Sequence, residues 1–201
     1  MKKHRIVLGS SSPRRKELLK NLTEDFEIMK PRFEEKLQAK EKPADYVLRN
    51  ALGKAGCIVE NSLGDLCDES VMVIGADTIV HLSGDILQKP VNREEAETML
   101  RRLSGQTHEV LTGVCVALYE PGQAPVYHQF LEKTQVTFTS LTDDDIKRYC
   151  DTGEPMDKAG AYGIQGRGAW MVEAIHGSYT NVVGLPMTSL AHFFRQHKIF
   201  T

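Results

Sequence analysis

Short runs of consecutive apolar residues predict the β-strands of this chain. The clearest runs cover residues 6–9 and 71–76, and both are typical of central strands that are buried on two faces. The second run stops at Asp77 and Thr78 and resumes over residues 79–82. This interruption predicts that Asp77 lies at the carboxyl end of a central strand. Further strands are predicted at residues 26–29, 86–87, 110–118, 133–138 and 170–175.

Helical spacing of apolar residues, together with capping signals, predicts the helices between these strands. Ser12 is a good N-cap, and Pro13 suits the first position of the helix that follows. Asn92 and Glu95 form a capping-box pattern. The predicted helices cover residues 13–22, 43–58 and 92–103, the segment from Thr142 to Gly153, and a last helix that begins at Pro186. Residues 30–42 and 61–69 are polar and are predicted to be connections. This order of elements predicts an α/β fold with a mixed, twisted sheet and flanking helices.

The bulk composition fits one globular domain with a substantial core. The chain has 201 residues, of which 41% are apolar and 26% are charged. Its net charge of -2 argues against a nucleic-acid polymer as partner, although a small anionic ligand needs only a local basic cluster. No apolar run approaches membrane-spanning length, and the apolar run after the basic residues 1–5 is too short for a signal peptide. We therefore expect a cytoplasmic protein.

The cysteines support the same expectation. Cys57, Cys67, Cys115 and Cys150 are scattered, and none of them forms a Cys-x-x-Cys pair. This spacing favours free thiols in a reducing compartment over disulfides, and it gives no support for a zinc site.

Two arginines stand where the helix dipole disfavours them. Arg14 and Arg15 fall in the first turn after Ser12, where each positive charge opposes the dipole by about 0.3–1 kcal/mol. A bound anion would reverse that effect, because serine hydroxyls such as Ser10, helix N–H groups and guanidinium groups together form a suitable phosphate cradle. The alternative is a capped helix with two solvated arginines, and this segment alone does not separate the two.

Acidic residues give a second candidate site. A lone carboxylate such as Asp77 at a strand end needs hydrogen bonds, a cation or a metal, and strand ends are where α/β sheets bind ligands. The alternative is a turn aspartate that bonds its own backbone. Glu34 and Glu35 lie in a charged loop and are by themselves typical of solvated residues. Paired with Asp77, one of them would complete a carboxylate set for magnesium or manganese.

The segment 154–166 is rich in glycine and carries Tyr162 and Gln165. Glycines let a backbone approach a ligand closely, and a glutamine amide offers both a donor and an acceptor, as the edge of uracil or thymine does. A structural loop is the alternative. For Lys54 and Lys89, taken alone, exposed lysines are the default interpretation.

Six ordered motifs, spread over nearly the whole chain, resemble the Maf family of nucleoside triphosphate pyrophosphatases. They are Ser10-x-Ser12-Pro13-Arg14-Arg15, Gly75-Ala76-Asp77-Thr78-Ile79-Val80, Lys89-Pro90, Leu103-Ser104-Gly105-x-x-His108, Asp157-Lys158-Ala159-Gly160-x-Tyr162-Gly163-Ile164-Gln165, and Gly177-Ser178-Tyr179-x-Asn181-Val182-Val183-Gly184-Leu185-Pro186. One departure is Gly9, where many relatives carry alanine; it should alter packing and not chemistry.

The resemblance implies hydrolysis of a nucleoside triphosphate between the α and β phosphates with a divalent cation, magnesium or manganese. Asp77 would be the proton acceptor or a metal ligand, and Glu35 a metal or water ligand. The residues implied to hold phosphates are Lys54, Lys89, Lys158 and Arg15 with the serine loop of Ser10 and Ser12. The implied catalytic set is Asp77, Glu35, Lys54 and Lys89, and Lys158 and Tyr162 are among the implied substrate-binding residues.

The resemblance also bears on the base and on the architecture. Arg14, Thr78 and Gln165 stand at positions linked to base choice, and this combination is similar to the branch acting on dTTP and UTP. The alternatives are the same reaction on 7-methyl-GTP or another modified nucleotide, and a non-catalytic nucleotide-binding regulator of cell division. The implied fold is one Maf-like domain, residues 1–201, with two lobes around a cleft as in inosine triphosphate pyrophosphatases. A homodimer is also implied.

Overall fold

The structure is a computed structural model that describes residues 4–66 and 69–199, with side chains for 4–61 and 69–199. Residues 1–3 of the basic start and Cys67 therefore lie outside the described side chains. The chain divides into two compact units. Unit 1 comprises Met1–Asp77, Thr112–Glu132 and Gly184–Thr201, and unit 2 comprises Thr78–Leu111 and Lys133–Val183.

A mixed seven-stranded sheet is the framework of the fold. Its order is β2-β1-β3-β5-β6-β7, and β4 pairs with β3 outside this path. β1 is parallel to β2 and β3, whereas the β3–β4 and β6–β7 pairs are antiparallel. The predicted mixed α/β fold is thus confirmed. The strands are β1 (Arg5–Gly9), β2 (Glu27–Ile28), β3 (Val71–Leu82), β4 (Asp85–Leu87), β5 (Thr107–Tyr119), β6 (Val126–Phe138) and β7 (Val172–His176).

The predicted break at Asp77 is wrong, because β3 runs without interruption through this residue. The strand changes its pairing partner there instead. β1 pairs with β3 as far as Gly75, and β4 pairs with it from Val80 onward. Asp77 interrupts the apolar pattern without ending the strand, since its carboxylate is bound by side chains and needs no turn.

Three predicted N-caps are confirmed, although some helix ends differ. The side chains of Ser12, Asn92 and Thr142 each accept a backbone N–H of the following turn. The second predicted helix continues through most of the expected connection at residues 61–69, and one short helix, α5, was not predicted. The helices are α1 (Pro13–Lys20), α2 (Pro43–Leu66), α3 (Arg93–Leu103), α4 (Asp143–Asp151), α5 (Tyr179–Val183) and α6 (Met187–Gln196), with 3₁₀ turns η1 (Glu154–Asp157), η2 (Ala159–Ala161) and η3 (Ala169–Met171).

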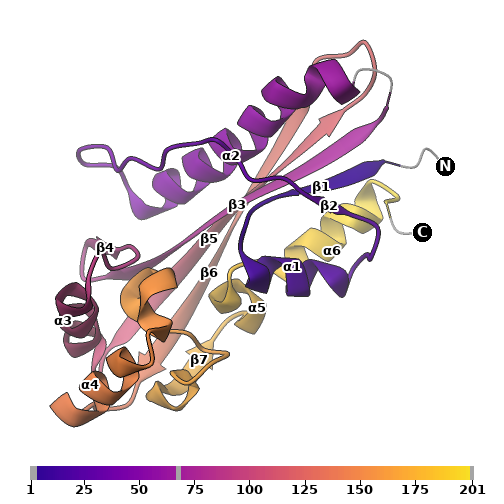
Figure 1. Cartoon of the computed structure of the whole chain (residues 1–201). Coiled ribbons are helices and arrows are strands. Elements are labelled where there is room, and N and C mark those ends of the chain that lie inside the picture. The colour runs from indigo at the N-terminus through magenta and orange to yellow at the C-terminus, as the bar shows by residue number, and fades with distance from the viewer. Residues whose placement is uncertain (1–3, 67–68, 200–201) are drawn as a thin grey trace. The chain divides into compact units, whose positions relative to one another are not determined.

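In unit 1, α2 packs very closely on the sheet, and its ribbon extends along β3 and β5 (Figure 1). A Cβ on Gly75 of β3 would lie 2.4 Å from the Ala51 carbonyl oxygen of α2. A Cβ on Gly113 of β5 would lie 2.6 Å from the Val47 carbonyl group of the same helix. Glycine is required at both positions because backbone meets backbone, and this approach brings polar side chains of α2 within reach of β3.

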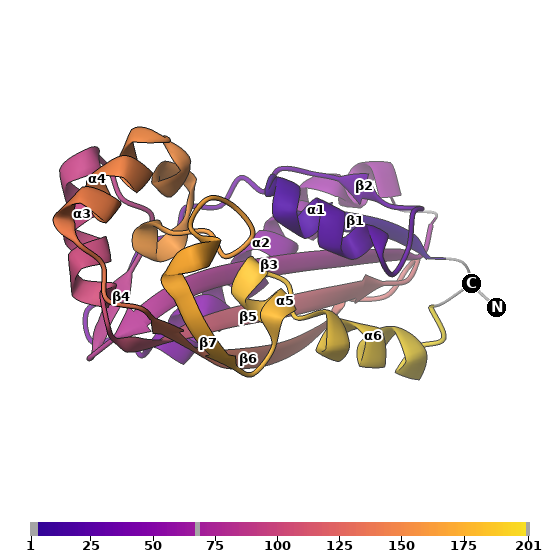
Figure 2. The ribbon, with the colours of Figure 1, turned by 90° about the horizontal axis from the view of Figure 1, so that it is seen from below.

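Unit 2 has its own core under α3 and α4, which lie side by side in Figures 1 and 2. Arg101 of α3 binds Asp143 of α4 at 2.8 Å across the exposed side of the pair. The core beneath them is apolar and includes Leu100, Phe138 and Ile146, each 1% exposed or less. The predicted glycine-rich segment contains η1 and η2, and its Ala161 and Tyr162 belong to this core.

None of the helices in the described parts of the chain combines the length and the apolar character that crossing a membrane requires.

Candidate functional site

A buried lysine holds the two predicted carboxylates together in unit 1. Lys54 Nζ lies 2.7 Å from Asp77 Oδ1 and 2.6 Å from Glu35 Oε1. Lys54 and Asp77 are only 7% and 5% exposed, whereas Glu35 reaches the surface. Charges this deeply buried are stable only when they are paired, so the three side chains form one electrostatic group. Lys54 is therefore not the exposed lysine that a helical position suggests by default.

Asn50, which was not predicted as a site residue, completes this group. Its Nδ2 donates to Asp77 Oδ2 at 2.9 Å, and its side chain is fully buried. Asn50 and Lys54 are one helical turn apart on α2, so both point toward β3. Its Oδ1 has no hydrogen-bond partner among the described residues. The available signal was an asparagine on the otherwise apolar face of a long helix.

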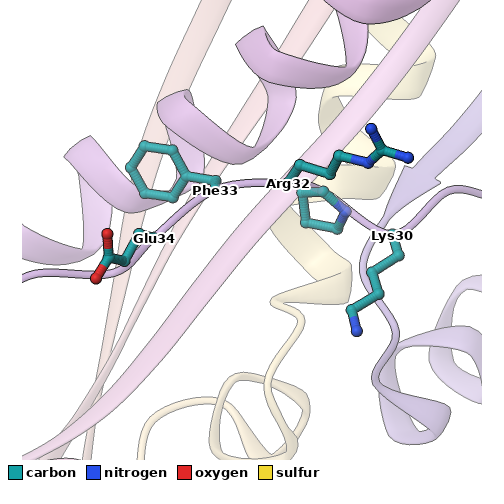
Figure 3. Close-up of a pocket in the computed structure, with 5 residues that line it drawn as sticks. Lys30, Arg32, Phe33 and Glu34 are labelled. Carbon is teal, nitrogen blue, oxygen red and sulfur yellow. The ribbon is translucent and has the colours of Figure 1, made fainter.

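Glu35 is delivered by an extended segment that packs against the same helix. Figure 3 shows Phe33 directed toward α2, whereas the side chains of Lys30 and Arg32 point in other directions. Lys30 to Glu34 line a pocket of about 680 Å³. A Cβ on Gly53 would lie 2.1 Å from the Phe33 ring, so the glycine preceding Lys54 makes room for the phenylalanine. This contact fixes the segment at Phe33, one residue before Glu34 and two residues before Glu35.

The turn from Ser10 to Arg15, which we name the serine–arginine turn, shares a hydrogen-bond acceptor with the carboxylate group. This acceptor is the Ala76 carbonyl oxygen. Arg15 Nη1 donates to the Ala76 carbonyl at 3.0 Å, and Lys54 Nζ donates to the same oxygen at 3.2 Å. Arg15 also donates from Nε to the Gly184 carbonyl at 2.7 Å and from Nη1 to Ser10 Oγ at 3.2 Å. The structure thus brings the turn and Asp77 together, as the motifs predicted.

The electrostatics of Arg15 reflect this position. Burial lowers the pKa of the Arg15 guanidinium, while the carboxylates of Asp77 and Glu35 oppose that shift. Ser12 caps α1 by accepting the Arg15 N–H at 3.4 Å, and Arg14 is half-buried in the same first turn. Arg15 is therefore bound in place by backbone oxygens, which contradicts the alternative of a solvated arginine at this position.

The donor set of unit 1 fits a divalent cation of the kind that prefers oxygen ligands. Glu35 and Asp77 each use one oxygen to bind Lys54, and carboxylate oxygens can accept more than one partner. Among the described residues no group of three or more His, Cys, Asp or Glu is placed to hold a metal. A magnesium ion binds one or two carboxylates and takes its other ligands from water and substrate phosphates, which this pair allows.

The remaining predicted site residues belong to unit 2. Thr78 follows Asp77 in β3 and is half-buried, and Lys89 and Gln165 are exposed. Lys158 is half-buried; its Nζ donates to the Glu154 carbonyl at 2.9 Å and to Asp157 at 2.6 Å. Their roles in substrate binding stay predictions.

Tyr162, which the resemblance places among the substrate-binding residues, is buried in the core of unit 2. It is 5% exposed, and its ring packs edge-on against His108 and Phe138. Its hydroxyl lies 2.8 Å from His108 Nε2. The apolar core of unit 2 takes up the ring, and the glycines around it allow the backbone to turn there. A substrate-binding role of Tyr162 stays a prediction, but an open aromatic surface is not what the structure holds.

His108 is the most perturbed histidine of the described residues. It is 1% exposed, and burial lowers its pKa to about 4. Its Nδ1 has no hydrogen-bond partner within the described part of the chain. The imidazole is therefore neutral at physiological pH and acts as a core residue.

Comparison with known proteins supports the motif-based resemblance. A dTTP/UTP pyrophosphatase of Bacillus cereus (strain B4264) is 45% identical over 195 residues, which cover 97% of this chain and 96% of that protein. A dTTP/UTP pyrophosphatase of Bacillus velezensis is 44% identical over 195 residues, with 97% of each chain covered.

A solved structure of the Staphylococcus aureus Ham1 protein aligns with a TM-score of 0.43 at 12% identity, covering 96% of this chain and 99% of that one. A likeness this distant does not show a shared fold, so the two-lobed architecture of inosine triphosphate pyrophosphatases stays a prediction. The family model for Maf-like proteins matches residues 5–197. With nearly the whole chain matched, and with relatives at this level of identity, the protein belongs to the Maf family.

Proposed function

We propose that this protein hydrolyses dTTP and UTP to the monophosphate and pyrophosphate. The two relatives named above are each named dTTP/UTP pyrophosphatase, and this chain aligns with them over nearly their full length. The observation that carries the proposal for this chain is the group formed by Glu35 with the buried Lys54 and Asp77. Such a group suits phosphoanhydride cleavage, which needs positioned charges and an acceptor for a water proton more than covalent chemistry.

Asp77 is the proposed proton acceptor. Lys54 and Asn50 each bind one of its oxygens, so the carboxylate is fixed in orientation before substrate arrives. A fixed, largely buried carboxylate does not need to reorganise when it takes a proton from the attacking water. Lys54 also keeps positive charge next to the reacting group, where negative charge develops.

A divalent cation completes the proposal. Glu35 and Asp77 would hold magnesium or manganese together with water and the phosphates. When bound, such a cation neutralises the charge that develops on the phosphates and acidifies a bound water. Arg15 and Ser10 at the serine–arginine turn, with Lys89 and Lys158, are the proposed phosphate ligands. Arg14, Thr78, Tyr162 and Gln165 are proposed to contact the nucleoside.

The test is a nucleotide panel with purified protein. We expect pyrophosphate release from dTTP and UTP with magnesium or manganese, little release from other common triphosphates, and loss of activity with a chelator. Release of single phosphates would contradict the reaction type. Preferred turnover of 7-methyl-GTP would contradict the base, and tight dTTP binding without turnover in either metal would favour a regulatory protein.

The proposal includes a cytoplasmic location and a homodimer. Free thiols at Cys57, Cys115 and Cys150 support a reducing compartment. Size-exclusion chromatography with light scattering tests the dimer; a monomeric mass at micromolar concentration would contradict it.

A further inference from the structure

The loop that carries Gln165 in unit 2 is built around the carboxylate of one residue, Glu154. Glu154 Oε2 accepts the Arg167 backbone N–H at 2.9 Å, and Glu154 Oε1 accepts the Tyr149 hydroxyl at 3.0 Å. The Tyr149 hydroxyl in turn accepts the Gly163 backbone N–H at 3.0 Å. The loop is thus fixed on both sides of Gln165, two residues before it and two residues after it.

Two glycines of the loop show how closely it surrounds this carboxylate. A Cβ on Gly166 would lie 2.3 Å from Glu154 Oε1, and one on Gly163 would lie 3.0 Å from the same oxygen. The Gly163 Cβ would also lie 2.5 Å from Lys158 Cε. The absence of side chains at both positions lets the backbone close around Glu154 and the Lys158 stem.

The same residue also binds one of the two predicted lysines of unit 2. Lys158 Nζ donates to the Glu154 carbonyl oxygen at 2.9 Å. The backbone of Glu154 therefore holds Lys158, while its carboxylate holds the loop that carries Gln165.

Tyr149 is suited to link the Glu154 carboxylate to the Gly163 backbone N–H. It is 3% exposed, and burial raises its pKa, so its hydroxyl stays protonated. A protonated hydroxyl donates one hydrogen bond and accepts others, which matches its contacts with Glu154 and Gly163.

We propose that Glu154 and Tyr149 are positioning residues that set base selectivity by fixing the loop that carries Gln165. This inference rests on the proposed function, because it takes Gln165 to face the base. Neither residue reaches Asp77 or Lys54 through any contact described above, so the proposal separates nucleotide selection from bond cleavage.

The decisive variants are Glu154→Gln and Tyr149→Phe. Glutamine keeps one acceptor oxygen, so it cannot accept from both the Arg167 N–H and the Tyr149 hydroxyl, and one of the two contacts is weakened or reversed in direction. Phenylalanine keeps the ring but leaves the buried Gly163 N–H without its acceptor. We expect the KM for dTTP and UTP to rise about tenfold, kcat to stay within about twofold, and preference over GTP to fall about tenfold, the order expected when one buried hydrogen bond is left unmade.

A second measurement follows the loop without catalysis. Hydrogen exchange of residues 160–168 should quicken in both variants, because Tyr149→Phe removes the acceptor of the Gly163 amide and Glu154→Gln weakens the acceptor of the Arg167 amide. The fluorescence of Trp170, the single tryptophan of the chain, reports on the adjoining turn η3. The matched control is Glu173→Gln, which removes the same charge from an exposed position of β7 and should change neither readout.

Faster exchange with unchanged selectivity would overturn the role in base choice, and unchanged exchange would overturn the positioning role itself. If the wild-type protein hydrolyses no triphosphate, the proposed function fails on its own. Selectivity is then measured as dTTP against GTP binding, and exchange in the variants still decides whether Glu154 holds the loop.

Discussion

In unit 1 Lys54, Glu35 and Asp77 bind one another through their charges, whereas in unit 2 Gln165 lies on a loop whose backbone is held by neighbouring side chains. Lys54 joins Glu35 and Asp77 directly, from a helix, a loop and a strand. Gln165 is exposed, and only the residues on either side of it are bound, through Tyr149 and Glu154. A change in unit 1 therefore alters charge at the proposed reacting group, and a change in unit 2 alters shape.

Because of this difference, a substitution has a different energetic cost in each unit. Buried charges depend on their partners, and removal of one partner leaves the other unpaired in a poorly solvated place. A loop fixed through backbone amides tolerates any exposed side chain that does not disturb those amides. We therefore expect substitutions in unit 1 to lower turnover. Substitutions in unit 2 should change nucleotide selectivity and the pH dependence of stability.

The largest expected effect tests the charge group. Asp77→Asn should lower kcat by about 10²–10⁴-fold, because the amide is a poor proton acceptor and a weak metal ligand. It keeps the size of the side chain and can still accept from Lys54, but the buried Lys54 charge loses the charge of Asp77 and keeps that of Glu35, so the midpoint of thermal unfolding should also fall. The measurement is pyrophosphate release from dTTP at saturating substrate. Full turnover in this variant would show that Asp77 is not the proton acceptor.

A pH titration tests the neutral core of unit 2. Burial lowers the pKa of His108 to about 4 in the folded protein, whereas a histidine in an unfolded chain has a pKa near 6.5. Below pH 6.5 the unfolded chain binds a proton that the folded chain refuses, so stability is lost as the pH falls toward 4. The loss from this residue should total about 3 kcal/mol.

His108→Gln should remove this part of the pH dependence, as measured by denaturant unfolding at several pH values. The control is His192→Gln at an exposed position of α6, which should leave the slope unchanged. An equal acid slope in His108→Gln and the wild-type protein would contradict a buried neutral imidazole.

The smallest effect compares two glycines of α2. Gly53→Ala places a methyl group where the Phe33 ring lies, whereas the nearest atom to a Cβ on Gly56 is the Tyr127 hydroxyl at 3.9 Å. Both changes favour the helix by about 0.5–1 kcal/mol. Gly56→Ala should therefore raise the free energy of unfolding with unchanged activity.

Gly53→Ala should displace Phe33 and the segment that carries Glu35. We expect the magnesium concentration for half-maximal activity to rise severalfold, with little net change in stability. Identical metal dependence in the Gly53→Ala and Gly56→Ala variants would argue that Phe33 does not position Glu35.

Local signals in the sequence predicted much of this structure. Ser12, Asn92 and Thr142 cap their helices because capping depends on a few adjacent residues. The interruption at Asp77 was misleading, because the partners of its carboxylate come from α2 and cannot be identified from neighbours in the chain.

The candidate site could be predicted only as far as its motifs extend. Asn50 and Glu154 were missed, since a buried amide and a carboxylate enclosed by a loop become visible only with their contacts. Tyr162 was named as a substrate-binding residue from its motif, but its ring is part of the buried core of unit 2, which the motif does not reveal. Long-range packing, and not local pattern, decided each of these cases.

The bond from Arg15 to the Gly184 carbonyl has a consequence for the order of folding. The two residues are 169 positions apart in the chain, and both belong to unit 1. During synthesis the arginine leaves the ribosome long before its acceptor exists, and all of unit 2 is made in between. Closing so long a loop is slow, so the serine–arginine turn should mature late, after the interposed unit has already collapsed.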